Sequence, residues 1–146
     1  MNKEPGMTLI VKTVTRLTVG IILMYGIYIV LHGHLSPGGG FAGGVIIALS
    51  FVHLMLAYGK ETAFKKLSMP IASVLESMGA ILFISIAFLG LAGGYFFFHT
   101  LGTGKPFSLF SAYTVLFSNI SISLKVGCGL FLVLVSIALA GKEIKK

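Results

Sequence analysis

Five ionisable side chains lie within or beside long apolar stretches of this chain, and they are its candidates for chemistry. They are Glu76, Lys125, His53, His34 and His32. An ionisable group at bilayer depth is rare, faces protein or water, and by default marks the path of an ion or a proton. The sequence shows no nucleophile–base pair, redox motif or cofactor-binding loop beside them. We therefore expect no catalysis by this chain and no bound cofactor.

The composition indicates an integral membrane protein. Hydrophobic residues make up 56% of the chain and charged residues only 10%, with a mean hydropathy of +1.01. A soluble domain is about 25% charged. The net charge of +7 would suggest nucleic acid as a partner of a soluble protein. Here the lysines cluster at the ends of apolar stretches, so no nucleic acid is expected.

Four stretches are long enough to cross about 30 Å of hydrocarbon as helices. They cover about 13–31, 41–58, 74–98 and 119–140, and they predict one all-α membrane domain over residues 1–146. Basic residues favour the cytoplasmic side, and they concentrate before the first span, between the second and third, and after the fourth. The basic residues concerned are Lys3, Lys12, Arg16, Lys60, Lys65, Lys66, Lys142, Lys145 and Lys146. Both termini are therefore predicted to be cytoplasmic. The external segment 100–118 could hold an interfacial helix or a re-entrant piece, and the sequence leaves both open.

Glu76 and Lys125 are the charged candidates. Glu76 lies about 9 Å beyond Pro70, at about 1.5 Å per residue, near the cytoplasmic end of the third span. It would be a carboxylate at headgroup level or part of an ion or proton relay. Lys125 lies early in the fourth span, near the external side, where it would extend outward to water or, if buried, pass protons. These positions predict opposite membrane faces and no direct pair.

The histidines leave more than one interpretation open. His53 lies about 18 Å into the second span, where it would be a hydrogen-bonded packing residue or a proton relay suited by its near-neutral pKa. His32 and His34 lie at the beginning of the loop after the first span. No cysteine or carboxylate stands near them at metal-ligand spacing, so no metal site is expected. Cys128, between two glycines, is predicted to be a small packing residue.

A proline and a run of glycines form a hairpin between the first two spans. Pro37 blocks helix continuation, and the glycines Gly38, Gly39 and Gly40 permit a sharp turn. Glycines four residues apart let another helix backbone approach closely. Such pairs are Gly39 and Gly43, Gly40 and Gly44, and Gly90 and Gly94. The hairpin would pack against a neighbour, or it would form a wet vestibule where His32 and His34 meet ions or protons.

The hairpin also carries a family resemblance. The sequence HGHLSPGGGFAGGVIIA, which starts at His32, resembles the signature of the MnhB/MrpB family of small membrane subunits. These subunits belong to Mrp-type Na⁺/H⁺ antiporters and to related modules of membrane-bound hydrogenases and sulfur reductases. The later segment LFSNISISLKVGCGLFLVL is more similar to the form in the hydrogenase-type modules.

The resemblance implies a non-catalytic, multi-pass subunit of a prokaryotic cytoplasmic membrane. Its partners would be lipid and other subunits, including large subunits related to those of complex I, with sodium ions and protons as the transported species. Two alternatives stay open. One is a small four-helix exporter that works as a homodimer, against which count the missing carboxylate in the first span and the absence of tryptophan. The other is a purely structural scaffold in which Glu76 and Lys125 carry no ion.

Overall fold

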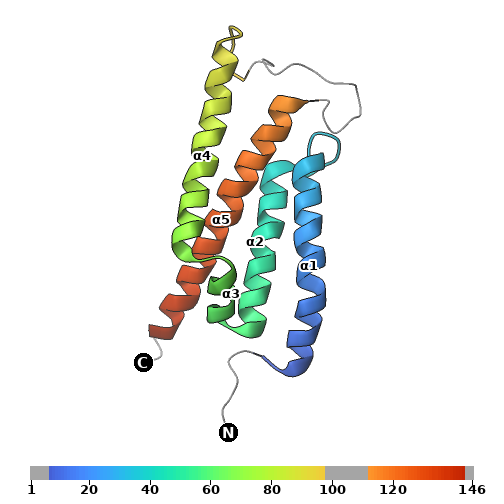
Figure 1. Ribbon diagram of the computed structural model, residues 1–146, viewed down its shortest axis with the longest axis vertical. Helices are drawn as coiled ribbons and strands as arrows, with labels where there is room; N and C mark the ends of the chain where they lie inside the picture. The colour runs from blue at the N-terminus through green and yellow to red at the C-terminus, as the bar shows by residue number, and fades with distance from the viewer. Residues whose placement is uncertain (1–6, 98–111, 144–146) are drawn as a thin grey trace.

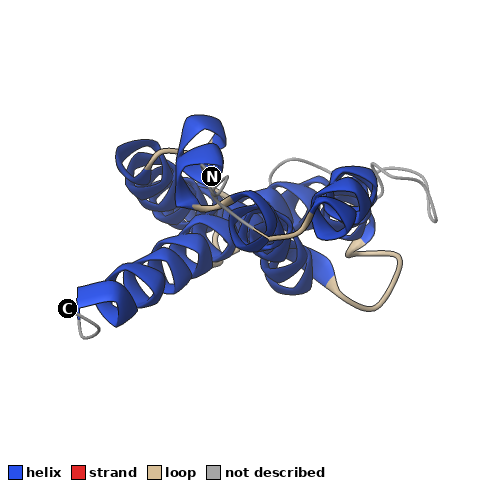
Figure 2. Cartoon of the chain, turned by 90° about the horizontal axis from the view of Figure 1, so that it is seen from below, coloured by secondary structure: helices blue, strands red, loops and turns tan. Residues whose placement is uncertain are grey.

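The computed structural model describes residues 7–97 and 112–143, and within them it is all helical (Figures 1 and 2). The helices are α1 (Leu9–His32), α2 (Gly39–Tyr58), α3 (Lys60–Lys66), α4 (Met69–Leu91) and α5 (Tyr113–Glu143). All but the short α3 are long and apolar enough to cross a membrane. The predicted all-α fold with four spans is thus confirmed.

The helices stand side by side in the order α4, α5, α2, α1 (Figure 1). The main packing contacts join α1 to α2, α2 to α5, and α5 to α4. Because successive long helices run in opposite directions, the start of α1 and the end of α5 lie at the same end of the bundle (Figure 1). This arrangement agrees with termini on one side of the membrane. The cytoplasmic assignment of that side stays a prediction from the basic residues.

The two largest differences from the predicted helix boundaries lie at the end of α4 and the start of α5. Helix α4 ends at Leu91, not near residue 98, because a glycine-rich turn follows it: the N–H groups of Gly93 and Gly94 donate to the carbonyls of Gly90 and Leu91. Hydropathy alone extended the span through the aromatic residues beyond that turn. Helix α5 begins at Tyr113, earlier than the predicted start at residue 119.

A buried hydrophobic core lies where α3 packs against the longer helices. A buried cluster there contains Met55 of α2, Ala63 of α3 and Ala72 of α4, together with Cys128 and Phe131 of α5. Phe131 is fully buried and meets Phe51 edge to face, at 6.0 Å between ring centroids. The cluster joins every helix except α1, so it fixes how α4 is placed against α5.

Candidate functional site

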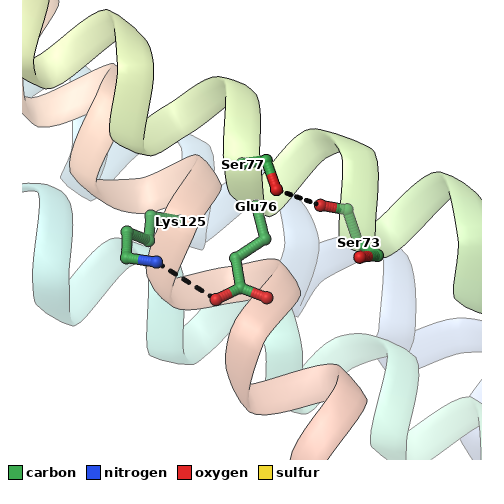
Figure 3. Close-up of polar contacts among 4 residues, drawn as sticks. All are labelled: Ser73, Glu76, Ser77 and Lys125. Atoms are coloured by element: carbon green, nitrogen blue, oxygen red, sulfur yellow. Dashed lines mark hydrogen bonds and ion pairs between the residues drawn. The ribbon is translucent and has the colours of Figure 1, made fainter.

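Glu76 of α4 and Lys125 of α5 form an ion pair (Figure 3). The Lys125 Nζ atom donates a hydrogen bond to Oε1 of Glu76 at 3.1 Å. The side chains are 51% exposed for Lys125 and 33% exposed for Glu76 in this chain by itself. The prediction that these two residues do not pair is therefore wrong.

The error came from the start of the fourth span. Because α5 begins at Tyr113, Lys125 lies about 18 Å along it, at about 1.5 Å per residue. Glu76 lies about 10 Å from Met69 along the antiparallel α4. The two side chains thus reach the same level, well inside a hydrocarbon layer about 30 Å thick.

Glycines on both helices make room for the pair. A Cβ atom on Gly79 would lie 2.7 Å from the backbone nitrogen of Lys125 and 2.8 Å from the carbonyl oxygen of Ser121. Helices α4 and α5 therefore meet backbone to backbone just beside the pair. A Cβ atom on Gly129 would lie 3.5 Å from Oε1 of Glu76, so the carboxylate rests over that glycine. Gly79 was not predicted as part of the site, although its position three residues after the only carboxylate in a span was the available signal.

The hydroxyl groups near the pair are bonded within their own helices. Ser77 donates to the carbonyl oxygen of Ser73 at 3.0 Å, on the stretch of α4 that carries Glu76 (Figure 3). The buried Ser121 donates to the carbonyl oxygen of Phe117 at 2.9 Å. Ser73 and Ser77 are both exposed at the surface of α4. Together with the ion pair they form a polar patch on a face that is otherwise apolar.

His53 lies in a different interface, between α1 and α2. Its Nε2 atom is 3.3 Å from Oγ1 of Thr15 and 3.4 Å from Oγ1 of Thr18. The Thr18 hydroxyl donates to the carbonyl oxygen of Val14 at 3.0 Å, so its oxygen is left to accept from an Nε2–H group. Thr15 is 1% exposed. The threonines were missed in the sequence, where their spacing of three residues on one helix was the only sign.

Helix α5 packs against the glycine hairpin and the start of α2. The N–H group of Gly40 donates to Oδ1 of Asn119 at 3.1 Å, and a Cβ atom on Gly40 would collide with the Asn119 carbonyl oxygen. One turn on, a Cβ atom on Gly44 would lie 2.9 Å from the carbonyl oxygen of Ser123. Gly43 instead faces α1, where its Cβ atom would lie 2.9 Å from the carbonyl oxygen of Gly26. The close helix approach expected of these glycines is thus present in the structure.

The turn of the hairpin depends on backbone conformations that glycine adopts more readily than other residues. Gly38 and Gly39 have φ angles of 141° and 83°, which other residues rarely adopt. Pro37 is exposed just before them. The side chain of His32 stacks on Tyr28, with ring centroids 4.2 Å apart, and its Nδ1 atom lies 3.2 Å from the Tyr28 carbonyl oxygen. His34 is half-buried in the hairpin. A vestibule role for the two histidines stays a prediction.

The third glycine pair does not behave as expected. Gly90 is buried near the end of α4. Gly94 lies beyond the end of that helix with a φ angle of 100°, and no atom lies within 4 Å of where its Cβ would be. The expected helix contact at Gly94 is therefore wrong, because that residue turns the chain and packs against nothing. The segment 100–118, predicted to be external, falls largely outside the described residues.

The chain matches known proteins over most of its length. The model for a domain related to the MnhB subunit of Na⁺/H⁺ antiporter matches residues 10–132. A Na⁺/H⁺ antiporter subunit of Bacillus subtilis is 36% identical over 104 residues, which are 70% of this chain and 71% of that protein. An uncharacterised protein of Methanocaldococcus jannaschii is 31% identical over 117 residues, which are 75% of this chain and 44% of that protein.

A solved structure shares the fold. It is a chain in the membrane-bound sulfane sulfur reductase, an archaeal respiratory membrane complex, with a TM-score of 0.75 and 30% sequence identity. The likeness covers 91% of this chain and 58% of that one. The resemblance found in the hairpin is thereby confirmed over nearly the whole length. The chain belongs to the family of membrane proteins related to the MnhB subunit of Na⁺/H⁺ antiporters.

Proposed function

We propose that this chain is an accessory, non-catalytic subunit of a Mrp-type Na⁺/H⁺ antiporter module. We further propose that the Glu76–Lys125 pair is a polar site along the pathway of the transported cation. The family and the solved relative in a respiratory membrane complex support the subunit role. The observation that carries the ion-path role is the pair itself, at 3.1 Å and partly exposed at bilayer depth.

The chemistry of the pair suits exchange of a cation for a proton. A carboxylate oxygen can hold a proton or contribute to a sodium site, since sodium, like other hard cations, prefers oxygen ligands. The ammonium of Lys125 competes for the same oxygen. Because the attraction between unit charges strengthens as water is excluded, small movements of the ammonium change how well Glu76 holds another cation. A charge at this depth is costly unless it faces protein or water. The assembled module would therefore have to supply protein or water around the pair.

Neutralising each member in turn tests the proposal. Glu76→Gln and Lys125→Met keep the size of the side chain and remove its charge. In vesicles that contain the assembled complex, both variants are expected to lose most sodium-dependent proton movement, measured per amount of complex recovered. Ser77→Ala is the matched control, because Ser77 is a neighbour whose hydroxyl bonds only to its own helix in the described contacts. Its exchange is expected to be unchanged.

Two results would redirect the assignment. Normal exchange by both charge-neutral variants in a normally assembled complex would leave a purely structural scaffold. Sodium-dependent transport by this chain alone, reconstituted without other subunits, would favour the self-sufficient exporter.

A further inference from the structure

A groove runs between α4 and α5 beside the ion pair, with a volume of about 380 Å³. Its lining includes Gly79, Ala80 and Phe83 of α4 and Ser121, Ile122 and Lys125 of α5. Gly79 and Ser121 are buried in the close contact of α4 with α5. Ala80 is therefore the small residue at the open side of the groove, and small residues let a membrane helix approach another closely.

Lys125 is the charged residue of this groove. Its ammonium has three N–H donors, and the contact to Glu76 uses one of them. Glu76 is the only acidic residue in the four spans, so those spans contain no second carboxylate for the ammonium. Hydrocarbon cannot accept a hydrogen bond, and a half-exposed ammonium at this depth therefore needs an acceptor beyond its described contact, from protein or from water.

Helix α4 is also the least covered of the spans. Only 17% of the most apolar part of α4 is buried, compared with 39% for α2. Most exposed side chains of both α1 and α4 are apolar, such as Leu17 and Ile21 of α1 and Ile81 of α4. Helix α4 also carries the exposed Ser73 and Ser77 next to Glu76.

We propose that a transmembrane helix of a partner subunit lies in this groove and places an acidic side chain opposite Lys125. The inference rests on the proposed function, in which the chain works inside a multisubunit complex. Two carboxylates and one ammonium carry a single net negative charge. One proton or one sodium ion neutralises that charge, so the partner helix completes a site for the two cations that the module exchanges.

Swapping the charges of Glu76 and Lys125 tests whether the partner presents an acidic group. The double variant Glu76→Lys with Lys125→Glu keeps opposite charges in the chain but presents a carboxylate to the partner's carboxylate. Like charges facing each other at an interface are strongly unfavourable, so recovery of the subunits that co-purify with the unaltered chain is expected to fall at least about tenfold. Helix content and thermal unfolding of the full-length variant show whether it still folds. Normal recovery of those subunits would overturn the acidic partner.

Filling the groove tests the docking site independently of charge. Ala80→Phe is expected to release the co-purifying subunits, whereas Ile21→Phe, on the exposed face of α1, is expected to retain them. The opposite pattern would overturn the groove as the docking site. A homodimer that Ala80→Phe separates, while the other subunits stay bound, would also overturn it, since the occupant would then be a second copy.

The two proposals can fail separately. If Glu76→Gln still abolishes exchange when Ala80→Phe assembles normally, the ion-path proposal stands and only the docking inference fails.

Discussion

Asn119 accepts a hydrogen bond from the backbone N–H of Gly40 at 3.1 Å and so ties the beginning of α2 to α5. The first four N–H groups of a helix have no partner within it, and Gly40 is the second residue of α2. Asn119 is only 8% exposed; its side chain occupies the space left by Gly33 and Gly39, and its backbone lies against Gly40. The hairpin is therefore held by a side chain far away in the sequence.

Asn119→Ala should lower the free energy of unfolding by about 1–3 kcal/mol, because it leaves the Gly40 N–H buried without an acceptor. Thermal unfolding of the purified chain in detergent measures the change. Ser118→Ala is the matched control, since its hydroxyl donates to the carbonyl oxygen of Thr114 in the same helix at 2.7 Å. Equal stability of the two variants would show that the contact to Gly40 contributes nothing.

Gly44→Ala should destabilise the bundle by about 1–3 kcal/mol, a typical cost of inserting a carbon into a packed interface. Its new Cβ atom would lie 2.9 Å from the carbonyl oxygen of Ser123, which is backbone and cannot rotate away. Gly20→Ala in α1 is the control, because no atom lies within 4 Å of its Cβ position. There the expected effect is neutral or stabilising, since alanine favours helix. A loss at Gly20 as large as that at Gly44 would contradict the close approach of α2 and α5.

The sequence was a good guide to what depends on hydropathy and local backbone preference. Long apolar runs predicted the four spans, and the glycine pairs in the hairpin predicted a close helix approach, which Gly40 and Gly44 make. The Glu76–Lys125 pair was not predictable in this way, because it depends on the relative register of two helices. An error of about six residues in the start of α5 moves Lys125 by about 9 Å, which is enough to place it near the other membrane face.

The partners of His53 were unpredictable for a related reason. Hydropathy places the histidine in a span but does not say which face of the helix it occupies. Only the packing of α1 on α2 brings Thr15 and Thr18 to its Nε2 atom. Gly94 shows the reverse case, in which a spacing typical of helix packing falls just beyond the end of the helix.

Thr15 and His53 should be energetically coupled. Thr15→Val removes the hydroxyl with little change in shape, and His53→Leu removes the ring nitrogen that faces it. In a double-mutant cycle the two changes should cost less together than the sum of the single variants, by about 0.5–1 kcal/mol. Chemical denaturation in detergent gives the four free energies. Strict additivity would mean that the 3.3 Å contact has no energetic weight.

Cysteine labelling should place the hairpin outside and α3 inside the cell. The two segments lie at opposite ends of the bundle (Figure 1), and the basic residues of α3 predict the cytoplasmic side for it. In a Cys128→Ala background, a membrane-impermeant maleimide added to intact cells should label Leu35→Cys, whose native residue is 41% exposed. Lys65→Cys, also at an exposed position, should be labelled only after the cells are opened. The background variant without added cysteine should stay unlabelled in both conditions. Labelling of Lys65→Cys in intact cells would reverse the predicted orientation and put both termini outside.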